Sequence, residues 1–159
     1  MRQQVKKAAA PVELESLPGH YIRRLQQIAV AIFLQETDGH GVTPVQYAAL
    51  HSVCNTPGID QRTLARSIGF DTSTIAGVVD RLEARGLLVR NTTPDDRRVR
   101  LLTLTDEGHA LLEAMTPSML RAQARMLEPL PPRERKEFMR MLRLLVAANN
   151  AMSRAPSEA

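Results

Sequence analysis

The hydrophobic period of the sequence changes at Gly86, and this change constrains the fold more than any other feature. In residues 72–85 apolar side chains recur every three or four positions, which is the spacing of one helix face. Residues 87–92 and 98–104 are instead two short β-prone runs on either side of a polar turn with proline and aspartate, a pattern typical of a hairpin. The sequence therefore predicts a long helix that is followed directly by a two-stranded hairpin.

A shorter helix precedes this pair. Asp60 is a good N-cap for residues 61–68, and Gly69 ends the short helix before the longer one begins after Asp71 or Thr72. The order of short helix, glycine-containing turn, longer helix and hairpin is the layout of a winged helix-turn-helix. In that layout the longer helix enters the major groove of DNA.

The rest of the chain is expected to be helical. Aromatic residues make up 3% of the sequence and tryptophan is absent, so the core has to be built from aliphatic side chains. We therefore predict a mainly α fold with a small β-hairpin wing, flanked by N- and C-terminal dimerisation helices. The expected organisation is a single domain at 17–150 between disordered tails at 1–16 and 151–159. Within this domain we expect the winged helix-turn-helix at about 43–104 and the dimerisation helices at about 17–38 and 106–150.

The outer face of the predicted long helix suits the edges of DNA bases. Its apolar residues form one inward stripe, and short side chains near the helix start let the backbone approach the major groove. The alternative is that these residues only cap a surface helix. The hairpin favours DNA binding, because an arginine at its tip suits the narrow minor groove and a neighbouring carboxylate can orient that arginine. The candidate DNA-binding residues are Thr72, Ser73, Thr74, Ala76, Gly77 and Arg81 on the helix, and Asp96, Arg97 and Arg98 in the hairpin.

Overall charge adds little to this argument. The net charge of +4 and the pI of about 9.8 are compatible with a polyanionic partner, but many proteins share that balance. Residues 59–100 carry eight basic and six acidic side chains, a net charge of only +2. The placement of the charges, rather than their total, would have to support DNA binding.

Several segments resemble the MarR family of bacterial regulators. The most specific part is a D-x-R wing that is followed by L-T-x-x-G. The likeness covers roughly residues 17–150, and it extends to members that control the breakdown of aromatic acids, including nicotinate. The matching segments are VTPVQYAAL at 42–50, TLA at 63–65, TIAGVV at 74–79, LEARGLLVR at 82–90, DDRR at 95–98 and LTLTDEG at 102–108.

The resemblance implies a homodimer that binds a pseudo-palindromic operator, with one helix in each major groove and one wing in each minor groove. In this arrangement Asp96 matches the wing carboxylate and Arg98 matches the arginine that it orients. The last predicted helix, residues 135–148, independently favours a dimer, because apolar residues occupy most of its circumference. A helix inside the core of one chain is the alternative, but so short a module offers little room for it.

Members of the family often respond to small phenolic or aromatic acids. The resemblance therefore implies a repressor that leaves its operator when a small aromatic carboxylate or phenolic effector binds. Such a ligand needs an apolar slot and a cationic or hydrogen-bonding group, although ordinary core packing would also explain the same residue types. The candidate effector-binding residues are His20, Tyr21 and Arg24 in the first helix, and Tyr47 and His51 in the second.

Other classes of function find less support. Cys54 is the only cysteine, and the four histidines show neither metal-ligand spacing nor a cysteine companion, so we expect no metal and no cofactor. A redox-sensing regulator that uses Cys54 is an alternative, although peroxide-sensing relatives carry their cysteine in the first helix. The sequence has no glycine-rich phosphate loop and no nucleophile elbow, which argues against an enzyme. A helical, dimeric protein-interaction module without specific DNA binding is a further alternative.

The sequence also predicts where the protein is found. No stretch approaches the roughly 18 apolar residues that a membrane span requires. The basic N-terminal residues are not followed by the apolar region of a signal peptide. We therefore expect a soluble, cytoplasmic protein.

Overall fold

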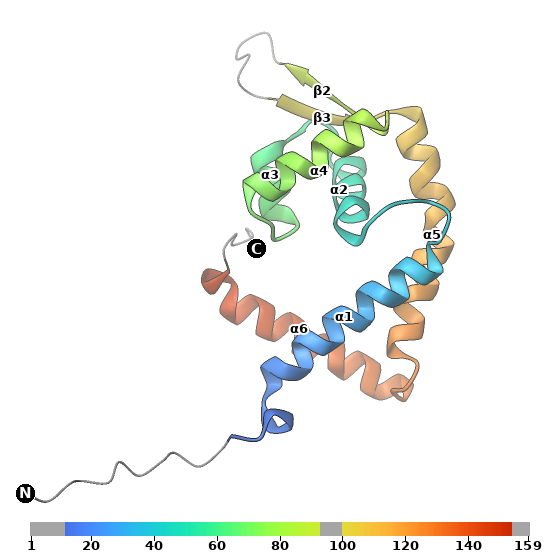
Figure 1. Ribbon diagram of the computed structural model, residues 1–159. Helices are drawn as coiled ribbons and strands as arrows, with labels where there is room; N and C mark the ends of the chain where they lie inside the picture. Colours follow the sequence, from blue (N-terminus) through green and yellow to red (C-terminus); the bar gives the residue numbers. More distant parts are fainter. Residues whose placement is uncertain (1–11, 93–99, 154–159) are drawn as a thin grey trace, which may run out of the picture.

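The computed structural model describes residues 12–92 and 100–153 and is mainly helical (Figure 1). The predicted fold class, a winged helix-turn-helix with a small β wing and flanking helices, is confirmed. In chain order the elements are η1 (Leu14–Ser16), α1 (Pro18–Glu36), α2 (Pro44–Asn55), β1 (Ile59–Asp60), α3 (Gln61–Ser67), α4 (Thr72–Ala84), β2 (Leu88–Thr92), β3 (Arg100–Leu104), α5 (Asp106–Leu127), α6 (Pro132–Asn149) and η2 (Asn150–Met152).

The sheet has three antiparallel strands in the order β1-β3-β2, rather than the two strands that the sequence predicts. Ile59 of β1 and Arg90 of β2 both lie opposite Leu102 of the central strand. β1 contains only two residues, which is too short for an alternating pattern to be recognised. The preceding Gly58, with a φ of 83°, turns the chain and donates its N–H to the carbonyl of Leu102 at 2.8 Å.

Side-chain caps define the starts of four helices, and two of these caps, at α3 and α4, are residues that the sequence singles out. Thr43 and Gln46 form a reciprocal capping box at α2. Asp60, Asp71 and Thr105 each accept backbone N–H groups from the first turn of α3, α4 and α5, respectively. These bonds are local, which is why the helix boundaries were predictable.

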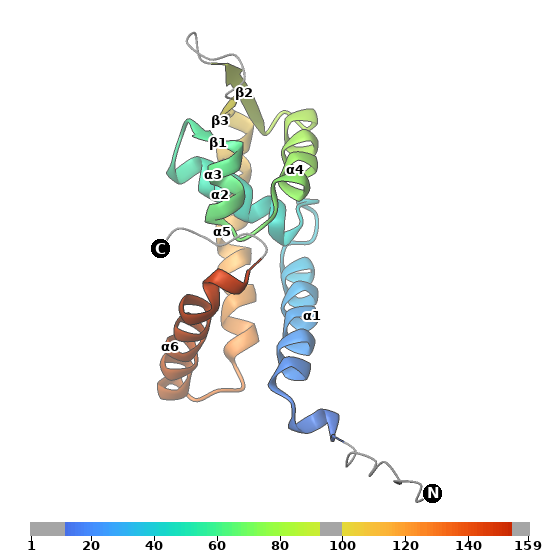
Figure 2. The ribbon, with the colours of Figure 1, turned by 90° about the vertical axis from the view of Figure 1, so that its left-hand side faces the viewer.

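The helices and strands form two parts, which we call the reading lobe (α2, α3, α4 and the sheet) and the base (α1, α5 and α6). α5 belongs to both, because it begins beside the sheet and ends at α6 (Figure 2). A smaller apolar cluster of Phe33, Val42 and Met115 lies where α1, α2 and α5 meet. The main core fills the reading lobe, and its fully buried members include Leu50, Leu64, Ile75, Leu82, Leu88 and Leu102.

Two sets of polar contacts connect the C-terminal end of α1, and the loop that follows it, to distant elements. Glu36 pairs with Arg121 and Arg125 of α5, at 3.3 and 3.1 Å. The guanidinium of Arg85, at the end of α4, donates to the carbonyls of His40 and Gly41 in the loop that joins α1 to α2, at 3.1 and 2.6 Å. The loop after α1 is thus attached directly to the end of α4.

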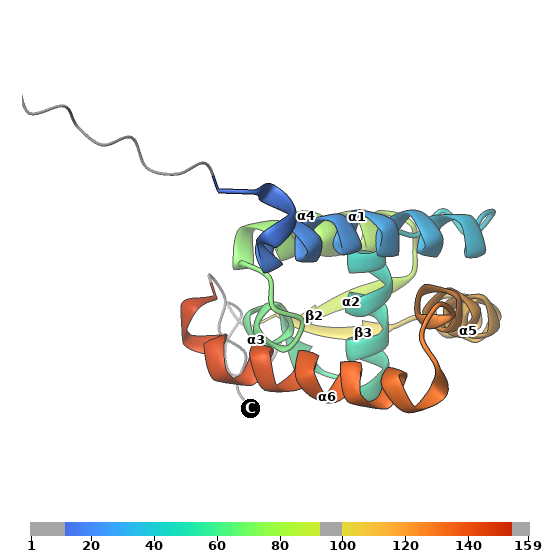
Figure 3. The same cartoon turned by 90° about the horizontal axis from the view of Figure 1, so that it is seen from below.

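α6 is the least covered helix. None of its residues is buried, and its apolar side chains Met141, Leu144, Leu145 and Val146 are exposed. Seen from below, α1 and α6 lie on opposite sides of the base (Figure 3). Within residues 12–92 and 100–153, no helix combines the length and apolar character needed to cross a membrane.

Candidate functional site

Asp71 organises the first turn of α4. Its carboxylate accepts the hydroxyl of Ser73 at 2.5 Å, and both the backbone N–H and the hydroxyl of Thr74, at 2.8 and 2.7 Å. The hydrogen bonds from Ser73 and Thr74 hold the pKa of the Asp71 carboxyl far below its ordinary value of 3.8. Asp71 is therefore an ionised acceptor with three donors, which is more than the simple cap expected from the sequence.

These bonds decide what Ser73 and Thr74 can offer to a ligand. Each hydroxyl hydrogen is directed at Asp71, so the lone pairs of the hydroxyl oxygens remain for a partner. Both side chains are exposed, as is that of Thr72 at the start of the helix. The first turn of α4 therefore presents hydrogen-bond acceptors beside the N–H groups of the helix terminus.

The remaining helix candidates lie further along α4. Arg81 is exposed, whereas Ala76 and Gly77 are half-buried rather than fully outward. A Cβ built on Gly77 would lie 3.8 Å from the guanidinium of Arg81, so the arginine side chain folds back over the glycine. An alanine at position 77 would be in ordinary van der Waals contact with Arg81.

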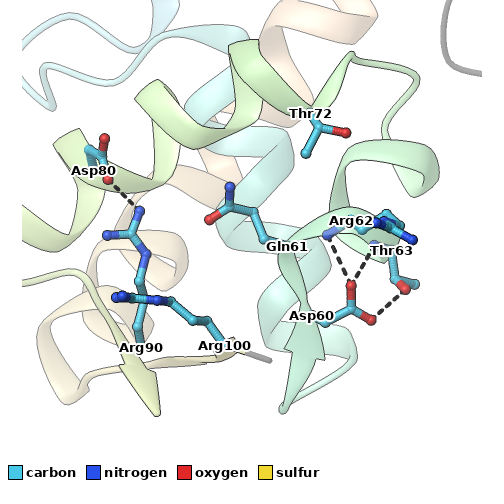
Figure 4. A pocket seen from close by; sticks show the side chains of 8 residues that line it. All are labelled: Asp60, Gln61, Arg62, Thr63, Thr72, Asp80, Arg90 and Arg100. Carbon is cyan, nitrogen blue, oxygen red and sulfur yellow. Dashed lines mark hydrogen bonds and ion pairs between the residues drawn. The ribbon is translucent and has the colours of Figure 1, made fainter. Parts of the chain in front are cut away.

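A polar pocket of about 830 Å³ lies between α3, α4 and the wing sheet (Figure 4). Among the described residues, three guanidinium groups and two carboxylates line it. Thr72 is the one described DNA-binding candidate from the sequence that lines it. The lining residues are Asp60, Gln61, Arg62, Thr63, Thr72, Asp80, Arg90 and Arg100.

Arg90 of β2 contacts two carboxylates of α4 at one wall of this pocket. One terminal nitrogen pairs with Glu83 at 2.7 Å, and the other makes a short ion pair with Asp80. The backbone N–H of Arg90 also donates to Glu83, at 3.3 Å. The sequence analysis did not single out this cluster. The alternation of side chains along β2 does indicate it, because it places Arg90 on the same face as the buried Leu88.

The hairpin candidates Asp96, Arg97 and Arg98 lie in residues 93–99, outside the described residues. The strands that lead to and from them are in register, with Thr92 of β2 opposite Arg100 of β3.

The effector candidates of α1 lie beside α6. The rings of His20 and Tyr21 are in edge contact, with centroids 5.4 Å apart, and Nδ1 of His20 is buried without a partner in the described part of the chain. Tyr21 and Arg24 line an apolar groove of about 620 Å³ between α1 and α6, together with residues such as Phe138. Tyr21 and Arg24 therefore face the groove between α1 and α6, within the base.

The effector candidates of α2 lie elsewhere, at the junction of α1, α2 and α5. Tyr47 packs against Phe33, with ring centroids 5.9 Å apart, and burial raises its pKa above 10.0 while a hydrogen bond with Thr116 offsets part of this effect. His51 is exposed, 6.0 Å from Tyr47 between ring centroids, and its Nδ1 lies 3.1 Å from the side-chain nitrogen of Asn55. Neither Tyr47 nor His51 lines the groove of Tyr21 and Arg24, so the five candidates form two groups.

Cys54 has a neighbour that the sequence did not reveal. Its Sγ lies 3.7 Å from Nδ1 of His109, which is 55 positions away in the chain. Their spacing in the sequence gives no sign of this contact. Among residues 12–92 and 100–153 there is still no group of three or more side chains that could hold a metal ion.

Comparison with known proteins identifies the class of this chain. A model of the MarR family matches residues 40–99. Among curated relatives, the HTH-type transcriptional repressor NicR of Pseudomonas putida is 31% identical over 136 residues, which cover 86% of this chain and 86% of that protein.

Solved structures agree with this family and with the fold. The PcaV transcriptional regulator of Streptomyces coelicolor, in complex with its natural ligand, has a TM-score of 0.81 and 38% identity, covering 88% of this chain and 99% of that one. The transcriptional repressor CouR, bound to a 23-mer DNA duplex, has a TM-score of 0.79 and 30% identity, covering 86% and 99%. These proteins are regulators rather than enzymes.

Proposed function

Because the chain belongs to the MarR family of DNA-binding transcriptional regulators, we propose that it is a repressor that leaves its operator when a small aromatic acid binds. Regulators of this family are dimers, so the proposed operator is pseudo-palindromic. The proposed unit comprises residues 17–150, acts in the cytoplasm, and inserts α4 into the major groove. We call α4 the recognition helix from here on.

The observation that carries this proposal is the exposed first turn of the recognition helix beside the polar pocket at the wing. Thr72, Ser73 and Thr74 are exposed at that turn, and Arg100 enters the same pocket from β3. With their hydroxyl hydrogens on Asp71, Ser73 and Thr74 are suited to accept from the amino groups of adenine or cytosine in the major groove. Arg97 and Arg98 are proposed to enter the minor groove.

The class of effector is supported by the relatives and by two groups of residues. A solved structure of Bordetella bronchiseptica BpsR, 32% identical to this chain, concerns the regulation of its DNA binding by 6-hydroxynicotinic acid, which is an aromatic acid. In this chain Arg24 supplies a cation beside an apolar groove, whereas Tyr47 and His51 supply rings at the junction of the two lobes. An aromatic carboxylate would satisfy either environment.

The DNA-binding proposal is tested by selecting duplexes from a random pool with the full-length protein and titrating the enriched duplex with salt. We expect a palindromic consensus and a steep loss of affinity as salt rises, because phosphate contacts release counterions. Arg98→Ala should cost about 1–3 kcal/mol of binding with the same consensus, whereas Thr74→Ala should also relax the base preference. If the protein enriches no sequence, the regulator proposal fails and a protein-interaction module becomes the better account.

The effector proposal is tested by thermal unfolding with a panel of benzoic, hydroxybenzoic and nicotinic acids. A true effector should raise the melting temperature of the free protein and lower its affinity for the selected duplex. Arg24→Ala and His51→Ala then show which group of residues holds the carboxylate, since only one of them should abolish the thermal shift. A panel without any stabilising acid would contradict this effector class.

A further inference from the structure

Arg90 occupies a position where a charged side chain needs partners. Alternation along β2 places it on the same face as Leu88, which is fully buried against the recognition helix. Its side chain is only 13% exposed. A guanidinium in such a place needs acceptors for its N–H groups. The two terminal nitrogens of Arg90 have carboxylate acceptors, whereas its buried Nε has no partner among the described residues.

The partners of Arg90 are Asp80 and Glu83, which lie three positions apart on the recognition helix. The planar guanidinium spans both carboxylates with its two terminal nitrogens, and the backbone N–H of Arg90 gives Glu83 a second bond. Such charge-assisted bonds from one rigid fork fix orientation as well as position. The wing strand β2 is thereby attached to the recognition helix at a defined angle.

The same contact controls the charge that the recognition helix turns toward the pocket. Asp80 lines the pocket and is 65% exposed, and Glu83 is 38% exposed. Without Arg90, the carboxylates of Asp80 and Glu83, one helical turn apart, would lose the guanidinium that pairs with both of them. They would repel phosphates within the range over which charges act at physiological salt, roughly 8 Å.

We propose that Arg90 is a positioning residue for DNA binding. By spanning Asp80 and Glu83 it sets the angle between the recognition helix and the wing, and it offsets one of their two negative charges, while it contacts no phosphate itself. This inference rests on the proposed function, and it concerns how one module inserts into two grooves at once.

The competing role for an arginine in this pocket is a direct phosphate contact. Arg90 is poorly placed for it, because both terminal nitrogens are engaged and the side chain is mostly covered. Arg100, which enters the same pocket from the neighbouring strand, is exposed and is the better candidate for a phosphate (Figure 4). The two arginines should therefore respond differently to salt.

The experiment compares full-length Arg90→Ala, Arg90→Lys and Arg100→Ala with the wild type on the duplex that the wild type enriches from a random pool. Affinity is measured across a salt series, and each complex is probed by hydroxyl-radical footprinting. The control is Arg140→Ala, which removes an equal charge from an exposed pair with Glu137 on α6, far from the wing. Thermal unfolding shows whether each variant is folded. If Arg90→Ala does not fold, Arg90→Lys replaces it in the comparison, because lysine keeps the positive charge but cannot span both carboxylates.

We expect both Arg90 variants to bind at least about tenfold more weakly, with the wild-type salt slope and with loss of footprint protection where the wing lies. Asp80→Asn with Glu83→Gln should restore part of the affinity of Arg90→Ala, a rescue that a purely structural role would not give. Unchanged affinity in Arg90→Ala would overturn the inference. A salt slope of Arg90→Ala reduced by about one unit per protomer would also overturn it, because that change indicates a lost phosphate contact and is the one expected of Arg100→Ala. If the wild type enriches no duplex, the proposed function itself fails, and that result is distinct from either outcome.

Discussion

At the scale of single residues, the carboxylate of Asp71 links the stability of the recognition helix to pH. Its hydrogen bonds with Ser73 and Thr74 depress its pKa in the folded protein below the ordinary value of 3.8. A depressed carboxyl stabilises the fold above its ordinary pKa, and this contribution is lost as the pH falls through the folded value. We therefore expect urea unfolding to show an acid-dependent loss of stability below about pH 3.8 in the wild type that is smaller in Asp71→Asn.

Asparagine is the appropriate comparison at this position, because it can still accept the N–H of Thr74 as an N-cap but does not titrate. Asp71→Ala removes the cap altogether and should be less stable than Asp71→Asn at neutral pH. An acid dependence of equal size in wild type and Asp71→Asn would show that other carboxyls carry it.

At the scale of secondary-structure elements, Gly108 allows α5 to begin directly against the wing. A Cβ at this position would lie 2.0 Å from the carbonyl oxygen of Leu87, which is backbone and has no room to move away. Thr105 adds to the junction, since its hydroxyl donates to the carbonyl of Gly86 at 2.6 Å and accepts the N–H of Gly108 at 3.0 Å. Gly108→Ala should therefore lower the free energy of unfolding by at least about 2 kcal/mol in urea titrations.

The matched control is the same substitution in the first turn of α1. Gly19 has no neighbouring heavy atom within 4 Å of an added Cβ, so Gly19→Ala should leave stability unchanged or raise it by less than about 1 kcal/mol. Equal effects of the two substitutions would contradict the close approach of α5 to the wing.

At the scale of the whole molecule, the base exposes more apolar surface than a single chain should leave in water. Leu144, Leu145 and Val146 of α6 are 57, 55 and 66% exposed, and Ile22 of α1 is 61% exposed. Tyr21, Ile22 and Leu145 all line the groove between α1 and α6, and we propose that a second copy covers this surface in the dimer. A dimer formed here would hold the two recognition helices at a fixed separation.

Leu145→Glu should weaken this dimer by at least about a hundredfold, because an unpaired carboxylate in an apolar interface costs several kcal/mol. Analytical ultracentrifugation over a range of concentrations would measure the change, and circular dichroism would show that the helices persist. Arg140→Ala, on the polar side of the same helix, should remain dimeric. A dimer of unchanged affinity in Leu145→Glu would place the interface elsewhere.

The sequence by itself determined what depends on neighbours within a few positions. The caps at Thr43, Asp60, Asp71 and Thr105 bond to the first turn of their own helices, and the change of period at Gly86 reflects residues that are adjacent in the chain. The fold class, the helix boundaries and the family motifs were therefore predictable. The residues proposed to contact DNA followed from the same local pattern.

Only the tertiary structure decided which distant residues meet. The two-residue strand β1 exists because β3 pairs with it, and the contact of Cys54 with His109 joins positions 55 apart. The effector candidates separate into two groups because α1 is long enough to carry its N-terminal half toward α6 and its C-terminal half toward α2. The attachment of Arg90 to the recognition helix also depends on how β2 packs against α4, because alternation alone identifies the inward face but not the carboxylates that lie there.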